Sequence, residues 1–295
     1  MNKHVYLILA HNEFEVLQKL LQALDDERND VFIHFDAKIQ SLPLLSMNRS
    51  KLYIIRNRVK VYWADFSMVQ AELNLLQEAV QQDTYDYFHF LSGVDMPLKS
   101  QDEIHRFFHE NAGKEFIDYC LYDVTEELTR KMKRWHLFPK NFKNTGGLNI
   151  VTRSLRVLFL RIQIATGWYR NRSLDFKKGS QWCSISEAFA RYLLEHQADI
   201  SRIFTHTFCP DEVMMQTLCW NSSFREHLYD VSMDYKGHMR LIDWGRGRPY
   251  VWQENDWNEL HASDRLFARK FSAGHIGIVN RLLEAVQTKD GYDER

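Results

Sequence analysis

The chain has 295 residues, of which 45% are hydrophobic and 26% charged, a balance that is typical of globular proteins and argues against disorder. Its formal net charge is −1, so the composition gives no electrostatic reason to expect a nucleic-acid partner. No window reaches the roughly 18 apolar residues of a membrane-spanning helix, and the apolar run near the N-terminus is too short for a signal peptide.

The four cysteines are spread along the chain, at positions 120, 183, 209 and 219. They form no Cys-x-x-Cys pair, and their spacing suggests neither a disulfide framework nor a zinc site. Together with the lack of an apolar leader, this pattern predicts a reduced, cytoplasmic protein.

The first part of the chain alternates between short apolar runs and helical patterns. Strands are expected at residues 5–10, 31–35, 52–55, 59–61 and 85–91, and amphipathic helices at 13–24 and 66–80. This order predicts an α/β domain with a mostly parallel central sheet and flanking helices. In such sheets ligands bind beyond the carboxyl ends of the strands, where this chain places His11, Asn12, Asp36 and Asp95. No Gly-x-Gly-x-x-Gly and no Walker-type loop occurs, which argues against a dehydrogenase or a P-loop NTPase.

The rest of the chain is less regular. Helices are expected at 101–109, 151–165, 187–196 and 274–288, and strands at 116–119, 178–185 and 239–244. Residues 131–156 are rich in lysine and arginine and contain the sequence Asn-Thr-Gly-Gly at 144–147, which is expected to be flexible. This stretch is interpreted either as a solvated loop or as a surface for an acceptor or a membrane.

Residues 205–220 combine a proline, two carboxylates and a helical pattern. Asp211 and Glu212 follow Pro210 and are expected in the first turn of a helix. Acidic residues are common at helix starts, so this fragment alone favours a structural role. A chemical role gains support from two basic clusters at 245–249 and 264–271, because guanidinium and ammonium groups can hold a diphosphate.

Six segments resemble, in the same order, those of one known family. They are 33–38 (Ile-His-Phe-Asp-Ala-Lys), 63–71 (Trp-Ala-Asp-Phe-Ser-Met-Val-Gln-Ala), 92–99 (Ser-Gly-Val-Asp-Met-Pro-Leu-Lys), 179–182 (Gly-Ser-Gln-Trp), 210–212 (Pro-Asp-Glu) and 266–271 (Leu-Phe-Ala-Arg-Lys-Phe). Over about residues 3–272 the chain resembles the core-2/I-branching β-1,6-N-acetylglucosaminyltransferases and the related peptide O-xylosyltransferases (glycosyltransferase family 14). It looks like a bacterial-type member of that family.

The resemblance implies a GT-A-type fold in one domain, with a nucleotide-binding half at 1–118, an acceptor and catalytic half at 119–275 and a C-terminal helix at 276–295. It implies transfer of a sugar from a UDP-sugar donor to an acceptor hydroxyl, with inversion and without a divalent metal. N-acetylglucosamine is the first candidate for the sugar, with xylose or another hexose as alternatives. The expected acceptor is a glycan or lipid-linked glycan in surface polysaccharide synthesis, with peripheral contact at the inner face of the membrane.

The resemblance also implies roles for individual residues, motif by motif. Glu212 corresponds to the catalytic base. Lys270 corresponds to a lysine on the UDP diphosphate, with Arg248 or Arg246 as its arginine partner. The remaining assignments are Phe35 and Asp95 at the uridine, Trp244 against the acceptor sugar, and Asp211 and Trp182 as further substrate contacts.

A metal site has little support in the sequence. Asp95 stands near the place of a metal-binding Asp-x-Asp, but residues 92–95 lack the second carboxylate. No metal or other cofactor is therefore expected, and basic side chains would stabilise the departing UDP instead. Two alternatives stay open: a metal-dependent GT-A transferase, and an inactive sugar- or nucleotide-binding protein on the same fold.

Overall fold

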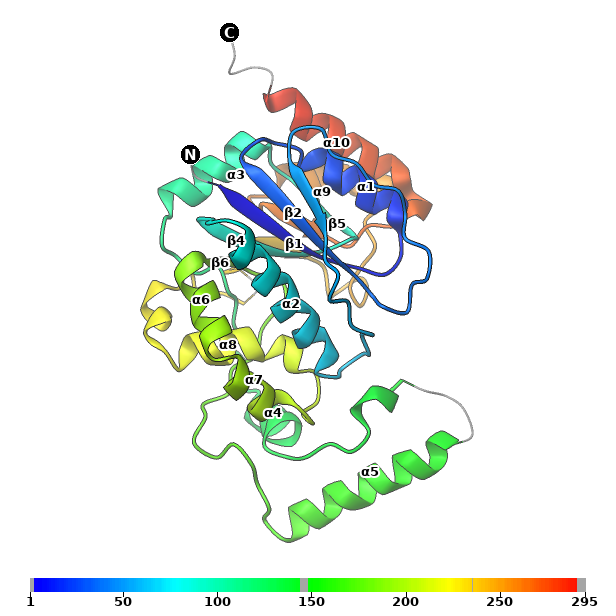
Figure 1. The fold of residues 1–295 in the computed structure, drawn as a ribbon, viewed down its shortest axis with the longest axis vertical. Helices are drawn as coiled ribbons and strands as arrows, with labels where there is room; N and C mark the ends of the chain where they lie inside the picture. Colours follow the sequence, from blue (N-terminus) through cyan, green and yellow to red (C-terminus); the bar gives the residue numbers. More distant parts are fainter. Residues whose placement is uncertain (1–2, 144–147, 235, 291–295) are drawn as a thin grey trace.

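The computed structural model describes residues 3–143, 148–234 and 236–290. Its centre is a five-stranded sheet in the order β3-β2-β1-β4-β6 (Figure 1). The strands are β1 (His4–Ala10), β2 (Asn29–Phe35), β3 (Lys51–Ile54), β4 (Tyr87–Ser92) and β6 (Ser184–Ser186). The first four run parallel and only β6 is antiparallel, so the predicted α/β architecture with a mostly parallel sheet is confirmed.

Helices cover both faces of this sheet. Strands β1, β2 and β4 are buried at every position, and their side chains alternate between two cores. Val5, Leu7 and Leu9 join the core under α2 (Ser67–Gln82), α6 (Glu187–Glu195), α7 (Gln197–Phe204) and α8 (Met214–Trp220). Tyr6 and Ile8 join the core under α1 (Phe14–Ala23), α3 (Gln101–Glu110), α9 (Trp257–Ala262) and α10 (Ile276–Asp290).

A second, three-stranded sheet connects segments that are far apart in the sequence. It has the order β5-β8-β7, with β5 at Asp95–Pro97, β8 at Phe267–Arg269 and β7 at Arg240–Ile242. β5 is antiparallel to β8, whereas β7 is parallel to it. Backbone hydrogen bonds from Leu98 to Leu266 and from Phe271 to Val94, both 2.8 Å, extend the pairing of β5 and β8. This sheet joins the two halves that the sequence distinguishes.

Several short elements differ from the sequence prediction. Residues 59–61 form no strand; the Val59 amide donates to the side chain of His34 (2.9 Å), outside any ladder. The expected strand at 116–119 is reduced to a bridge between Phe116 and Ser184, and of 178–185 only the last two residues enter β6. Arg240–Ile242 replaces the longer strand expected at 239–244.

The helix expected after Pro210 is interrupted. Pro210–Glu212 form a 3₁₀ turn, and the α-helix starts only at Met214, because Val213 has a φ of −134°. Four further 3₁₀ turns lie at Pro139–Asn141, Ser223–His227, Glu254–Asp256 and Ala273–His275.

Of the helices in the second half, α4 (Thr125–Met132) packs on the core of the five-stranded sheet through Leu128 and Met132, whereas α5 (Leu148–Ala165) extends away from it. α4 leads into a loop, and α5 lies at the end of the molecule farthest from α10 (Figure 1). The stretch 144–147, expected from the sequence to be flexible, lies outside the described residues. Within the described part of the chain, no helix is both long enough and apolar enough to cross a membrane.

Candidate active site

The carboxyl ends of β1 and β2 border a cavity of about 350 Å³. Its walls include His11 after β1, Asp36 after β2, and the exposed Trp63. Asp36 accepts the backbone N–H of Lys38 at 2.9 Å and pairs with its ammonium at 3.2 Å. The sequence placed His11 and Asp36 at this edge because parallel strands end together, and the structure brings them to one cavity.

Phe35 does not line this cavity. Its ring is fully buried on the opposite face of the sheet, edge-on to Phe14 with ring centroids 5.8 Å apart. The reason is the alternation of side chains along β2, which turns His34 and Asp36 towards the cavity and Phe35 away from it. A direct contact of the Phe35 side chain with a bound base therefore has no support in this geometry. Trp63, which carried no assigned role, is the aromatic residue of this cavity.

Asp95, the first residue of β5, forms a buried ion pair with Arg269. The Ser92 hydroxyl donates to its Oδ1 at 2.6 Å and the Ser92 amide to its Oδ2 at 2.9 Å. The Arg269 guanidinium completes the set, 3.1 Å from Oδ1. Burial raises the pKa of Asp95 and the charge of Arg269 opposes that rise. With both oxygens engaged and 1% exposure, Asp95 fixes Arg269 rather than facing a ligand.

Trp182 packs against the same arginine. The Arg269 guanidinium lies 4.2 Å from the centre of the indole ring, and only 8% of Trp182 is exposed. Burial lowers the pKa of His11, and the positive charges of Lys38 and Arg269 add to that lowering, so Arg269 lies within electrostatic range of the first cavity. The Arg269 guanidinium is therefore held between the Trp182 ring and the Asp95 carboxylate.

Lys270 and the loop 243–250 lie at the carboxyl ends of β8 and β7. The loop is tied to Lys270 by its backbone: the Lys270 amide donates to the Tyr250 carbonyl (3.3 Å), and the Trp252 amide donates to the Lys270 carbonyl (3.0 Å). Trp244, with 49% of its surface exposed, extends from this loop. The sequence-predicted cluster of Trp244, Arg246, Arg248 and Lys270 is thus brought to one region.

The two arginines of the loop differ in their partners. The Arg246 guanidinium forms ion pairs with Asp243, with Asp256 (3.1 Å) and with Glu259 (2.8 Å). Arg248 is exposed and has no ion pair within the residues that the structure describes. A guanidinium that is already paired with three carboxylates is poorly available to bind a diphosphate. The geometry therefore favours Arg248 over Arg246 as the arginine at the UDP diphosphate.

Glu212 and Asp211 point in different directions from the same 3₁₀ turn. The Glu212 side chain is 39% exposed and lies 3.8 Å from the ammonium of Lys131. Asp211 is turned inward, with Oδ1 enclosed and without a hydrogen-bond partner. Burial, together with the charge of Glu212, raises the pKa of Asp211 to about 7. Asp211 is partly exposed as a residue but has an enclosed Oδ1, whereas the Glu212 side chain is 39% exposed, so Glu212 is the more accessible carboxylate of the two.

A buried polar layer supports Glu212 from behind. The Gly179 amide donates to the Glu212 carbonyl at 3.0 Å, and a Cβ on Gly179 would lie 2.1 Å from the carbonyl oxygen of Asp118. Deeper in the core, Gln181 donates to Glu72 at 2.7 Å, and burial raises the pKa of Glu72 well above its ordinary value. Sequence reasoning missed Glu72 because it sits in a regular helical pattern and nothing near it signals chemistry.

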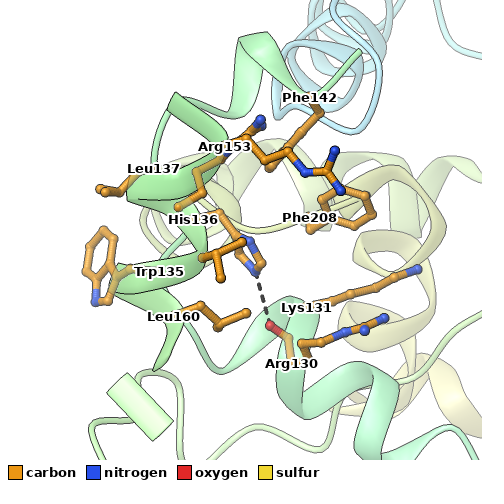
Figure 2. A pocket seen from close by; sticks show the side chains of 11 residues that line it. Arg130, Lys131, Trp135, His136, Leu137, Phe142, Arg153, Leu160 and Phe208 are labelled. Atoms are coloured by element: carbon orange, nitrogen blue, oxygen red, sulfur yellow. Dashed lines mark hydrogen bonds between the residues drawn. The ribbon is translucent and has the colours of Figure 1, made fainter. Parts of the chain in front are cut away.

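Lysines surround Glu212 on the other side. Glu127 bridges the ammonium groups of Lys131 (2.6 Å) and Lys178 (2.9 Å). Burial acts to lower the pKa of Lys178, but the hydrogen bond and charge of Glu127, with a smaller contribution from Glu212, raise it overall. Lys131 also lines a second cavity, of about 320 Å³, which Figure 2 shows between α4, the loop after it and α5. The other lining residues are Arg130, Trp135, His136, Leu137, Phe142, Arg153, Arg156, Val157, Leu160 and Phe208.

This second cavity is lined by several residues of the basic stretch 131–156. His136 donates to the Arg130 carbonyl at 3.0 Å, which fixes its ring in the wall (Figure 2). The cavity combines three arginines with aromatic surface, an arrangement that suits sugars and anionic groups. Among the residues described, no group of three or more His, Cys, Asp or Glu is placed to hold a metal ion.

Comparison with known proteins identifies relatives along most of the chain. The human Beta-1,3-galactosyl-O-glycosyl-glycoprotein beta-1,6-N-acetylglucosaminyltransferase is 24% identical over 299 residues, covering 90% of this chain and 65% of that protein. Its counterpart from Bos taurus is 26% identical over 301 residues with the same coverage. Xylosyltransferase 2 of Rattus norvegicus is 22% identical over 291 residues, covering 91% of this chain but only 32% of the relative.

Among solved structures, mouse Xyloside xylosyltransferase 1 in its apo form aligns with a TM-score of 0.35 and 10% identity, covering 91% of this chain and 97% of that one. That similarity is too low to argue a shared fold. Family membership is shown by a different comparison: the family model described as "Branch: Core-2/I-Branching enzyme" matches residues 5–264. The chain belongs to the Core-2/I-Branching enzyme family.

Proposed function

We propose that the protein is an inverting glycosyltransferase that moves a sugar from a UDP-sugar to an acceptor hydroxyl. The observation that carries the proposal is the position of Glu212. It is the more accessible carboxylate of the Pro-Asp-Glu segment, and it lies 3.8 Å from the ammonium of Lys131, a residue that lines the cavity of Figure 2.

Glu212 acts as the general base in this proposal. The acceptor oxygen attacks the anomeric carbon while its proton passes to the Glu212 carboxylate, and the bond from that carbon to the UDP oxygen breaks on the opposite face. The transition state has oxocarbenium character, by analogy with glycoside hydrolysis. The ammonium of Lys131, 3.8 Å from the Glu212 carboxylate, helps to hold that side chain in position.

The departing UDP is stabilised by Lys270 and Arg248. Both lie at the carboxyl ends of β8 and β7, and neither has an ion pair within the described residues. Arg246 serves instead to anchor the loop that carries Arg248. The uridine occupies the cavity at the ends of β1 and β2, where Trp63 offers an aromatic face and Asp36 a hydrogen-bond acceptor.

The acceptor enters from the side of the second cavity. N-acetylglucosamine is the first candidate for the transferred sugar, because two of the relatives are named for its transfer; xylose and other hexoses are the alternatives. A glycan or lipid-linked glycan of a surface polysaccharide is the acceptor class that we propose. Transfer without a divalent metal is part of the proposal, since Lys270 and Arg248 supply the positive charge.

The test is a panel of UDP-sugars assayed for UDP release and for transfer, each with and without EDTA, in the wild type and in Glu212→Gln. We expect turnover of one donor that survives EDTA, and about 10²–10⁴-fold slower transfer by Glu212→Gln with UDP affinity retained. Loss of activity with EDTA would overturn the metal-free mechanism. An unaffected Glu212→Gln enzyme would overturn the role of the base, and binding without any turnover would favour a silent nucleotide-binding protein.

A further inference from the structure

The helix α5 exposes an apolar stripe to solvent. Val151, Leu155, Leu158 and Ile162 recur at intervals of four, three and four residues and therefore share one helical face. Each of them is at least 44% exposed. Of the nineteen exposed large hydrophobic residues in the described part of the chain, nine lie between Ile150 and Tyr169. An exposed apolar patch of this kind marks a surface that binds a partner molecule or a membrane.

The opposite face of α5 is attached to the protein. Gln163 is fully buried and exchanges hydrogen bonds with the backbone of Trp135, at 2.8 and 2.9 Å. Arg134 donates to the carbonyls of Gln163 (2.6 Å) and Trp168 (2.8 Å). Arg156 and Leu160 line the cavity of Figure 2 from this side. The helix is thus held on its polar face, with its apolar face directed outward.

The segment around α5 is strongly and exclusively basic. Residues 128–174 contain eleven Lys and Arg and no Asp or Glu, although the whole chain has a net charge of −1. Arg161 lies on α5 itself and is exposed. Trp168 and Tyr169 follow the helix and are 50% and 37% exposed, the residue types that favour the boundary between lipid and water.

We infer that α5 is a membrane-surface helix that binds anionic phospholipid bilayers, with its apolar stripe in the headgroup region and its basic surroundings against the lipid phosphates. An amphipathic helix with large aliphatic residues on one face and Arg and Lys beside it is suited to lie in the plane of the interface. The three arginines inside α5 are incompatible with a spanning orientation. Pairing of two copies through the stripe would bring together two sets of eleven unopposed positive charges.

This inference does not depend on the proposed transferase activity, because lipid binding requires no turnover. The two are nevertheless geometrically related. The cavity of Figure 2 lies between α5 and Lys131, and Lys131 is 3.8 Å from Glu212. A membrane-bound α5 therefore holds the acceptor side of the site near the bilayer surface.

The experiment is flotation of the full-length protein with vesicles made of equal parts phosphatidylglycerol and phosphatidylcholine, compared with phosphatidylcholine alone. We expect binding to the anionic vesicles that weakens as salt rises, and little binding to the zwitterionic ones. Replacing Val151, Leu155, Leu158 and Ile162 together by Gln is expected to weaken binding at least about tenfold. The circular dichroism spectrum and melting temperature of this variant are expected to match those of the wild type, which verifies its folding.

The matched control replaces four exposed apolar residues elsewhere by Gln, namely Leu44, Ile54, Val231 and Met233. This variant is expected to bind vesicles like the wild type. Arg161→Glu, a single surface change with little risk to folding, is expected to weaken anionic binding about tenfold. The inference is overturned if the wild type does not float with anionic vesicles or if the stripe variant floats equally well. It is also overturned if light scattering shows that the stripe instead holds two copies together.

Discussion

At the scale of single residues, the environment separates side chains that are chemically alike. Asp211 and Glu212 are adjacent, yet one is enclosed with a pKa near 7 and the other meets solvent and Lys131. Asp118 is also fully enclosed: its Oδ1 accepts the Ser180 amide at 2.7 Å, while Oδ2 has no partner. Burial raises the pKa of Asp118 to about 7. The polar layer behind Glu212 is therefore partly protonated at neutral pH.

This layer makes the stability of the fold depend on pH. The Asp118 carboxyl keeps its proton up to about pH 7 when folded but loses it near its ordinary pKa of 3.8 when unfolded. The folded state binds more protons between these values, so the free energy of unfolding falls as the pH rises from about 4 to beyond 7. Asp118→Asn, which cannot ionise, is expected to flatten this slope in urea denaturation curves measured across that range.

Two other buried carboxyls, Glu115 and Asp211, have pKa values raised to about 7, so part of the slope is expected to remain in Asp118→Asn. The control is Asp264→Asn, because the Asp264 side chain is 77% exposed and should leave the slope unchanged. Equal slopes in Asp118→Asn and the wild type would show that Asp118 is ionised in the folded protein at neutral pH.

At the scale of elements, the loop between β7 and the 3₁₀ turn at Glu254–Asp256 carries two arginines, Arg246 and Arg248, for which we expect different roles. Arg248→Ala is expected to lower kcat/KM for the donor about 10²-fold, because it removes a group that stabilises the departing diphosphate. Its melting temperature should stay near that of the wild type, since Arg248 has no ion pair to lose within the described residues.

Arg246→Ala is the matched comparison, and its effect should differ in kind. It removes the centre of an ion-pair cluster with Asp243, Asp256 and Glu259, so the loop loosens and the melting temperature falls. Steady-state kinetics and thermal unfolding of both variants separate the two roles. A larger loss of kcat/KM in Arg246→Ala than in Arg248→Ala would reverse the assignment.

The long elements were predictable from sequence because their periodicity is local. The apolar runs of β1 and β2 and the stripe of α2 extend over many residues, so tertiary contacts only adjust their ends. The short strands were not predictable, since β5, β7 and β8 have three residues each and depend on one another across the chain. The site shows the same division. The order of the motifs was enough to identify Glu212, Arg248 and Lys270 as candidate site residues. The inward orientation of the Phe35 side chain and of Asp211 Oδ1 depends on tertiary packing, which the sequence pattern does not reveal.

At the scale of the whole molecule, charge is separated along the chain. The eleven basic residues of 128–174 leave 27 Lys and Arg against 39 Asp and Glu elsewhere, a net charge of −12 for the remainder. α5, inside the basic segment, lies at the far end of the structure from α10 (Figure 1). The protein is therefore nearly neutral in total but strongly polarised.

Ion-exchange chromatography at pH 7.5 measures this polarity. We expect the protein to be retained on a cation exchanger despite its net charge of −1, because the basic segment can bind locally. Replacing Arg153, Arg156 and Arg161 by Gln is expected to lower the salt concentration at elution. Passage of the wild type through the cation exchanger at low salt would show that the basic groups are neutralised by the rest of the molecule.

The three-stranded sheet also has a consequence for how the chain folds as it is synthesised. β5 is made early, but its partner β8 and the segment that pairs with Val94 emerge from the ribosome only after residue 266. Glu13, at the start of α1, likewise has its hydrogen-bond donors late in the chain. The Ser272 hydroxyl and the Ala273 amide donate to its carboxylate at 2.9 and 2.7 Å. The nascent protein must therefore expose the edge of its first half until residues 266–273 have been synthesised. A translational stop before residue 266 would leave β5 and Glu13 without these partners, and chaperone engagement of the nascent chain is the expected result.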